Sequence, residues 1–253
     1  MMATRVEAGR GWGWLVEGWQ LFIQAPGIWI VMLLIYLGVS MVLMLIPFVG
    51  GIAQVLLSPV LIGGMLYGAA TQGRGGALEI AHLFRGFQDQ ERMGPLVMLG
   101  LFSVAGYVLI VLVVVALFGG SMMMGMMMEG AGTNLPPEAA GGLVAGVGLV
   151  TVLLVLLIGT VVAMALFYAI PLVMLAGQNA WPAVQASLLG CWINMLPLLV
   201  FGLIYIVLAA VAMLPLGLGF LILGPVTACA AYISYRDVFA DTADTVVGVR
   251  LDK

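Results

Sequence analysis

Long stretches without any charged residue dominate the chain. No Asp, Glu, Lys or Arg occurs in residues 18–73, 93–128 or 139–235. A helix that spans a membrane needs about 20 predominantly apolar residues, so these stretches have room for two, one and three spans. Runs of strictly alternating apolar and polar residues, which are typical of β-barrel strands, do not occur in them. The pattern predicts an all-α, polytopic membrane protein with six transmembrane helices, near residues 27–47, 51–72, 95–119, 142–176, 195–214 and 217–236.

Short amphipathic stretches precede the first, third and fifth predicted spans, at residues 12–24, 78–90 and 181–194. In each stretch apolar residues recur at helical spacing along one side, and polar residues such as Ser187 and Asn194 take the other. The first apolar stripe consists of Trp12, Leu15, Val16, Trp19, Phe22 and Ile23. Because each stretch is too short to span a bilayer, we expect three amphipathic helices that lie in the plane of the interface.

The same arrangement recurs three times along the chain. A proline follows each amphipathic stretch, at Pro26, Pro95 and Pro197, and the second helix of each hairpin carries another, at Pro59, Pro171 and Pro225. We interpret residues 11–73, 77–177 and 181–239 as three degenerate repeats of one helix-hairpin unit. Together they form a single membrane domain of residues 1–239, followed by a short tail of residues 240–253.

The prolines of the second helices have two interpretations. A proline inside a helix removes one backbone donor and bends the helix. The bends either improve packing between helices or line a cavity around Pro59, Pro171 and Pro225, and Ser58 or Thr227 could satisfy a freed carbonyl group. The Gly64–Gly68 and Gly142–Gly146 pairs have the spacing that lets helix backbones approach closely.

Composition and charge support this topology. The 253-residue chain is 64% hydrophobic and 8% charged, whereas a soluble domain has about 25% charged residues. With six spans, all eight basic residues fall on one side, which the positive-inside rule assigns to the cytoplasm together with both termini. The tryptophans lie near the same face, where we expect Trp12, Trp19, Trp181 and Trp192 to act as interface anchors.

Candidate chemistry is sparse. The only histidine, His82, lies with Arg85 and Asp89 on a stretch that we expect to form a cytoplasmic surface, with Arg85 and Asp89 paired. Cys191 and Cys229 are expected to be reduced, packed thiols. No catalytic triad, paired carboxylates or phosphate-binding loop is present, so we expect no enzyme activity and no cofactor.

Methionines cluster at the outer end of the third predicted span. Thioethers are ligands suited to Cu(I), so copper binding is one interpretation; contact with lipid or a partner, or a plain apolar helix end, are the others. Because no His or Cys lies nearby, we expect no metal. The cluster consists of Met122, Met123, Met124, Met126, Met127 and Met128.

Several segments resemble an uncharacterised family of proteobacterial "hypothetical transmembrane proteins". They are APGIW (25–29), LSPVLIGG (57–64), HLFRGF (82–87), Ala186-Ser187 and YRDVF (235–239). The layout is also loosely similar to the membrane domains that accompany some glycerophosphodiester phosphodiesterases, without their catalytic domain. The resemblance implies a multi-pass protein of the bacterial inner membrane and supplies no active-site residue.

Two classes of function remain. One is a non-enzymatic scaffold, either an accessory subunit of a larger membrane complex or a lipid-organising protein. The alternative is a permease or carrier for a small neutral or lipidic solute; copper handling is a third hypothesis. Intramembrane charge usually marks proton or ion pathways, and its absence favours the scaffold. The expected partners are the lipid bilayer and other membrane protein subunits; a net charge of −3 without a basic stripe argues against nucleic acid.

Overall fold

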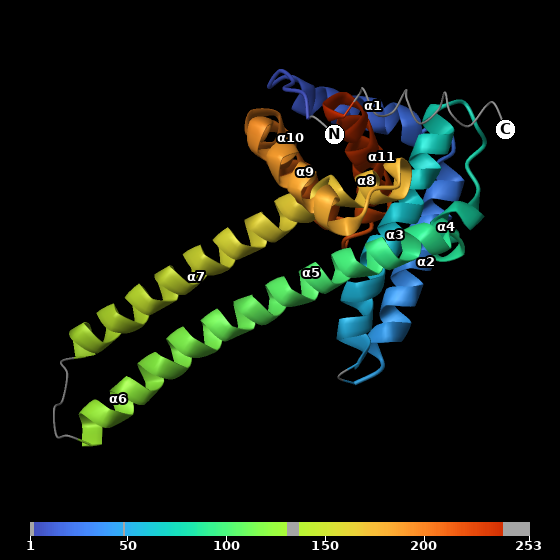
Figure 1. The fold of residues 1–253 in the computed structure, drawn as a ribbon. Helices are drawn as coiled ribbons and strands as arrows, with labels where there is room; N and C mark the ends of the chain where they lie inside the picture. The colour runs from blue at the N-terminus through green and yellow to red at the C-terminus, as the bar shows by residue number, and fades with distance from the viewer. Residues whose placement is uncertain (1–2, 48, 131–136, 240–253) are drawn as a thin grey trace. The chain divides into compact units, whose positions relative to one another are not determined.

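The computed structural model is helical, as the sequence predicts (Figure 1). It describes residues 3–47, 49–130 and 137–239, and no strand occurs within these ranges. Five helical segments are long and apolar enough to cross a membrane: Pro26–Met44, Val49–Gly73, Gln90–Met127, Ala145–Ala176 and Met195–Met213. They correspond to the first five predicted spans.

The sixth predicted span coincides with a helix that is not among those five. Helix α11 (Phe220–Val238) is 19 residues long and contains Pro225. Its last turn carries Arg236 and Asp237, and these charges lower the apolar character of the helix. Many of its side chains, including Tyr232 and Val238, are buried against other helices. The predicted helix is therefore present, but its length and composition do not establish a sixth membrane crossing.

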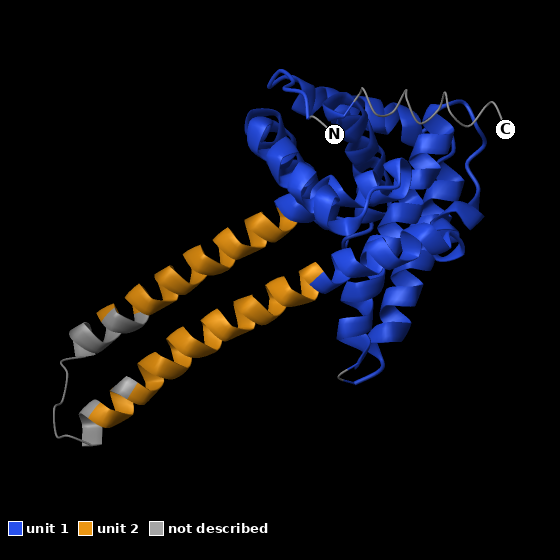
Figure 2. Ribbon diagram, in the orientation of Figure 1, with its two compact units in different colours: residues 1–101, 164–253 blue, residues 102–163 orange. Residues whose placement is uncertain are grey.

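Two compact units divide the chain (Figure 2). The first comprises residues 1–101 and 164–253, and the second comprises residues 102–163. The second unit holds the C-terminal part of α5 (Gln90–Val114), a π-helical turn (Val115–Gly119), α6 (Gly120–Gly130) and most of α7 (Pro137–Phe167). Residues 240–253, the predicted tail, lie outside the described residues.

Three short helical segments and their neighbours build the first unit. The first segment is α1 (Arg10–Phe22), followed by the hairpin of α2 (Pro26–Met44) and α3 (Val49–Gly73). The last is α9 (Ala180–Ile193), followed by α10 (Met195–Met213) and α11. Pro26 begins α2, where its fixed φ suits the first helical position and its missing N–H costs no hydrogen bond.

The middle segment departs from the prediction of one continuous helix over residues 78–90. The structure has a 3₁₀ helix at Ile80–Phe84, then α4 (Arg85–Gln88), and Asp89 in an extended conformation before α5 begins at Gln90. Gly86 explains part of the difference, because its backbone lies against Val60 of α3 and a side chain there would collide. The close approach to α3 therefore shapes this segment more than its amphipathic pattern does.

Each short segment packs against a helix of a different hairpin. The 3₁₀ helix contacts α3, α9 contacts α8 (Ala169–Ala176), and α1 contacts α11. Two of these contacts share a geometry: a β-carbon on Gly86 would lie 2.9 Å from the Val60 carbonyl oxygen, and one on Gly18 would lie 2.9 Å from that of Val226. Both valines directly follow the proline inside their helix.

The predicted glycine pairs differ in their surroundings. Gly64 lies directly against the main-chain carbonyl groups of His82 and Leu83, and Gly68 lies against the Leu78 side chain. This pair brings α3 close to the 3₁₀ segment, so its close approach is confirmed. Among the described residues, no atom outside their own stretch of helix lies within 4 Å of a β-carbon built on Gly142 or Gly146.

We predict that Gly64→Ala destabilises the protein although alanine is the better helix former. The added methyl group would overlap the Leu83 carbonyl group, which belongs to the backbone and cannot rotate away. Overpacking of this kind costs about 1–3 kcal/mol. The control is Gly51→Ala in the same helix, where the methyl group meets open space. Thermal unfolding in detergent would contradict this account if both variants had the same midpoint.

Candidate functional site

A cluster of charged side chains joins the first helix of the chain to the last. The Asp237 carboxylate at the end of α11 accepts hydrogen bonds from Arg10 Nε (2.7 Å) and from the indole N–H of Trp14 (2.9 Å), and it forms an ion pair with the Arg10 guanidinium. Trp14 is completely buried, and the Asp237 side chain is 17% exposed. Charge-assisted hydrogen bonds of this kind are about twice as strong as neutral ones.

Glu17 extends the cluster. Its carboxylate is 2.8 Å from Arg10 and 3.5 Å from Arg236. Burial lowers the pKa of Arg10, but the hydrogen bonds and charges of Asp237 and Glu17 outweigh it, so the net shift is upward. Arg10 is therefore a permanent cation in a structural cluster and has no role as an acid or base.

The N-terminal segment is fastened to the same region through Asn194. The Asn194 side chain is fully buried. It accepts a hydrogen bond from the Val6 N–H (2.9 Å) and donates to the carbonyl oxygens of Thr4 (2.9 Å) and Gly190 (3.0 Å). Thr4 in turn donates its N–H to the Val238 carbonyl oxygen of α11 (2.8 Å). The assignment of Asn194 to the polar side of the stretch 181–194 is therefore wrong, because its short amide satisfies main-chain groups inside the protein.

An apolar groove of about 660 Å³ lies between α1, α10 and α11. Leu15 and Phe22 of the predicted α1 stripe are buried, whereas Trp12, Trp19 and Ile23 are about half exposed. The stripe thus combines buried and half-exposed residues, and Trp12, Leu15, Val16 and Trp19 of it line the groove. The groove is lined by Trp12, Leu15, Val16, Trp19, Leu208, Val211, Ala212, Leu214, Pro215, Gly219, Ile222, Leu223 and Val226.

The predicted pairing of Arg85 with Asp89 is wrong. Asp89 instead forms an ion pair with Arg92 (3.1 Å), because the extended backbone at Asp89 breaks the helical register that i, i+4 pairing needs. Arg85 is exposed and lies over the Tyr67 ring at 5.5 Å, a cation–π contact. Arg92 also donates to the Met174 carbonyl oxygen at the end of α8.

His82 has a local structural partner. Its Nδ1 accepts a hydrogen bond from the Glu79 N–H (3.2 Å), and its ring packs edge-on against Tyr67 with centroids 5.4 Å apart. These contacts cap the 3₁₀ helix. Among the described residues no group of three or more His, Cys, Asp or Glu side chains could hold a metal ion.

Ser187 also lies inside, contrary to its predicted place on a polar face. Its side chain is fully buried, donates to the Met164 carbonyl oxygen (2.6 Å) and accepts from the Tyr168 N–H (3.0 Å). It thereby bridges the break between α7 and α8. Cys191, one turn further, is a buried free thiol, and burial raises its pKa to about 12, so it stays protonated. Cys229 is likewise free and buried, as predicted.

The tryptophans fall into two groups. Trp12, Trp19, Trp181 and Trp192, the predicted anchors, are between 46% and 68% exposed. Trp14 and Trp29 are completely buried, so these two do not serve as surface anchors. Trp29 donates its indole N–H to Gln72 (2.9 Å), whose amide donates to the Leu21 carbonyl oxygen of α1 (3.0 Å).

The three helix prolines are all buried. Ser58 donates to the Val55 carbonyl oxygen (3.2 Å), which is the group that Pro59 leaves without its helical partner. Thr227 donates to the Leu223 carbonyl oxygen instead (2.7 Å), one turn above its own position. Pro171 follows the break at Tyr168, and Pro225 lies between Leu223 and Val226, which line the groove.

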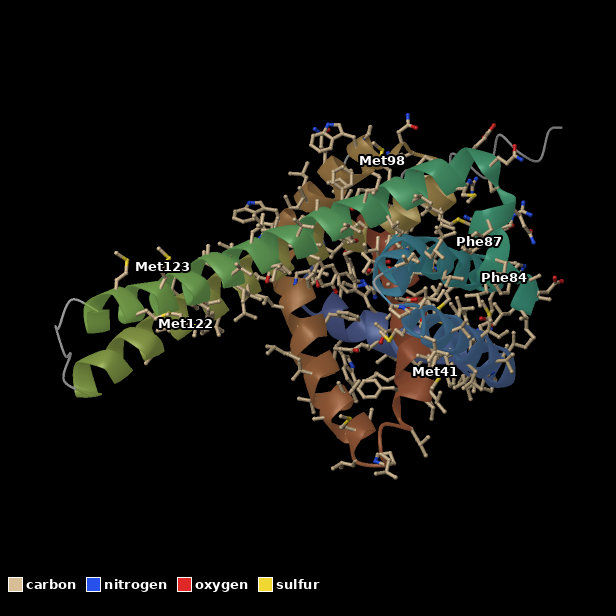
Figure 3. All side chains as sticks on the ribbon, turned by 90° about the horizontal axis from the view of Figure 1, so that it is seen from below. Met41, Phe84, Phe87, Met98, Met122 and Met123 are labelled. Atoms are coloured by element: carbon tan, nitrogen blue, oxygen red, sulfur yellow. The ribbon has the colours of Figure 1, made fainter. Side chains whose placement is uncertain are left out.

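The methionine cluster lies on α6 at the end of a long apolar helix. Met122 and Met123, seen in Figure 3, are 72% and 64% exposed, and Met126 and Met127 are exposed to a similar degree. Such surface suits adaptable apolar contacts. The side chains of Met124 and Met128 lie outside the described residues, and the absence of copper stays a prediction.

Searches of protein-family models, of curated proteins and of solved structures found no match to this chain.

The polar residues that organise this region escape sequence reasoning for a common reason. Gln72, Ser187 and Asn194 are isolated polar residues in apolar surroundings, and residue type alone does not show that such residues are buried. For Gln72 and Asn194 the signal that could identify them is their position at the end of a helix, where unpaired main-chain groups need partners. For Ser187 it is the spacing, because Ser187 stands at helical spacing from Val184 and Cys191 on the apolar side of α9.

We predict that Asp237→Ala destabilises the protein by about 2–4 kcal/mol, because it removes the acceptor for Arg10 and Trp14 and leaves a partly buried cation without its main partner. The matched control is Arg85→Ala. Arg85 is exposed and lies over the Tyr67 ring, so its loss should change stability by less than about 1 kcal/mol. Equal unfolding midpoints for the two variants in detergent would show that the Asp237 cluster is not structural.

Proposed function

We propose that the chain is a non-enzymatic protein of the bacterial inner membrane, either an accessory subunit of a larger complex or a lipid-organising scaffold. One observation carries the proposal: the charged side chains that the structure brings together pair with one another and hold helices together. Asp237 and Glu17 pair with Arg10, Glu17 also pairs with Arg236, and Asp89 pairs with Arg92. These groups lie in or beside the short segments, and the apolar lengths of the spanning helices hold no charge.

The proposed topology has six spans with both termini in the cytoplasm. The one-sided distribution of basic residues supports it. So does the division of α1 into faces, since Trp12, Trp19 and Ile23 are exposed on one side, whereas Arg10 and Glu17 lie on the opposite side of the helix. A helix with these faces suits the boundary between headgroups and hydrocarbon. In α9, exposed Trp181 and Trp192 support the same placement.

The threefold repeat is part of the proposal. In each repeat the second helix of the hairpin contacts the short segment of the next repeat: α3 contacts the 3₁₀ segment, α8 contacts α9, and α11 contacts α1. These three contacts form a closed cycle. The matching contacts of Gly86 with Val60 and of Gly18 with Val226 support two of the three copies. At α9 the connection instead runs through Ser187, which bonds Met164 of α7 and Tyr168 directly before α8, in keeping with a divergent middle repeat.

A carrier for a neutral or lipidic solute is the second candidate. The apolar groove beside Pro225 favours it, because a lipidic solute needs a path without charge. Exposed apolar side chains over α5, α6 and α7 favour the scaffold, since they offer partner or lipid contact along a second unit.

We predict that the tagged protein, purified from its membranes in mild detergent, retains a stoichiometric membrane subunit or a defined set of lipids. After reconstitution into vesicles of phosphatidylethanolamine and phosphatidylglycerol, it should not accelerate the transfer of a fluorescent phospholipid between leaflets. The control is an unrelated polytopic protein purified in the same way. A monomer that lacks partners and lipids would contradict the scaffold, and rapid transfer between leaflets would establish the carrier instead.

A further inference from the structure

The groove between α1, α10 and α11 is a wedge. At one end the two long helices approach closely, because Gly219 at the start of α11 lies directly against Ala212 of α10. Toward the other end α1 separates them: its Gly11 lies against Pro197 and Phe201 of α10, and its Gly18 lies against Val226 and Ala230 of α11. The space of about 660 Å³ between the helices is bounded by α1 and by the turn that joins α10 to α11.

The walls of the wedge select an apolar occupant. No lining residue is charged, and the hydrogen-bonding side chains that line it are only those of Trp12 and Trp19. Water or a polar solute would lose hydrogen bonds there. On α10, Leu203, Val207 and Val211 are all more than half exposed, as expected of a surface that contacts hydrocarbon.

Trp12 and Trp19 indicate which part of the groove lies at the membrane–water interface. Buried Trp14 and Trp29 donate their indole N–H groups to protein acceptors. Among the described residues, Trp12 and Trp19 have no such acceptor, so their indole N–H groups can donate to ester or phosphate oxygens. Tryptophan at this position is typical of the level at which headgroups meet acyl chains.

We propose that this groove binds one acyl chain of a phospholipid of the cytoplasmic leaflet, with its glycerol-ester region beside Trp12 and Trp19. The acyl chain takes the place that side chains would otherwise fill in the wedge between α10 and α11. This site rests on the proposed membrane placement of α1 and gives the lipid-organising role a defined ligand. The narrow end at Gly219 and Ala212 favours a single flexible chain over a helix from a partner or a second copy.

Photocrosslinking of the full-length protein tests the site. The protein is reconstituted in vesicles of phosphatidylethanolamine and phosphatidylglycerol that contain a trace of phosphatidylcholine with a diazirine in one acyl chain. We expect adducts to concentrate on the groove residues of α10 and α11. Val211→Trp, which places a ring in the groove, should lower this labelling about tenfold. The matched control is Val207→Trp, an exposed valine one turn away that does not line the groove.

If Val211→Trp does not fold, as judged by the loss of its thermal unfolding transition, Ile222→Trp provides the same test. This variant fills the groove from α11. Equal labelling in the Val211, Ile222 and Val207 variants, or adducts spread evenly over exposed α10 residues, would overturn the site and indicate only general bilayer contact. Co-purification of a subunit is a separate readout, so the accessory role can fail while the lipid site stands.

Discussion

Closure of the first unit depends on the contact between α1 and α11. Lipid tails are as apolar as leucine side chains, so helices in a bilayer gain little from burying leucine against leucine. Close backbone packing and polar bonds must supply the association. Both occur here: Gly18 allows α1 to lie against the Val226 carbonyl group, and Asp237 binds Arg10 and Trp14 within the same pair of helices.

Other features follow from this contact. Because α1 is held to α11 on one side and to α10 on another, it separates these two helices and leaves the apolar groove between them. On one face of α1, Glu17 forms an ion pair with Arg236 of α11, and on the opposite face Trp12 and Trp19 are exposed. One short helix thus combines a structural ion cluster with an apolar surface.

The sequence predicts the helices well because long charge-free runs leave few alternatives to them. It also predicts the free, buried thiols and the exposure of Trp12, Trp19, Trp181 and Trp192. The errors lie in the short segments, where length and periodicity carry less information. Asp89 pairs with Arg92 because the backbone is extended at Asp89, and Ser187 and Asn194 turn inward because main-chain groups of distant segments need partners. The groove depends on which helices are neighbours, and a single sequence does not contain that information.

The central claim is that the short segments lie at the cytoplasmic face while the methionine helix lies on the other side. Cysteine accessibility in intact cells tests it most directly, in a chain whose buried thiols are replaced through Cys191→Ala and Cys229→Ala. The account predicts that a membrane-impermeant maleimide labels Met126→Cys in intact cells and labels Arg85→Cys only after the inner membrane is opened. Labelling of Arg85→Cys in intact cells, or protection of Met126→Cys, would contradict the proposed topology.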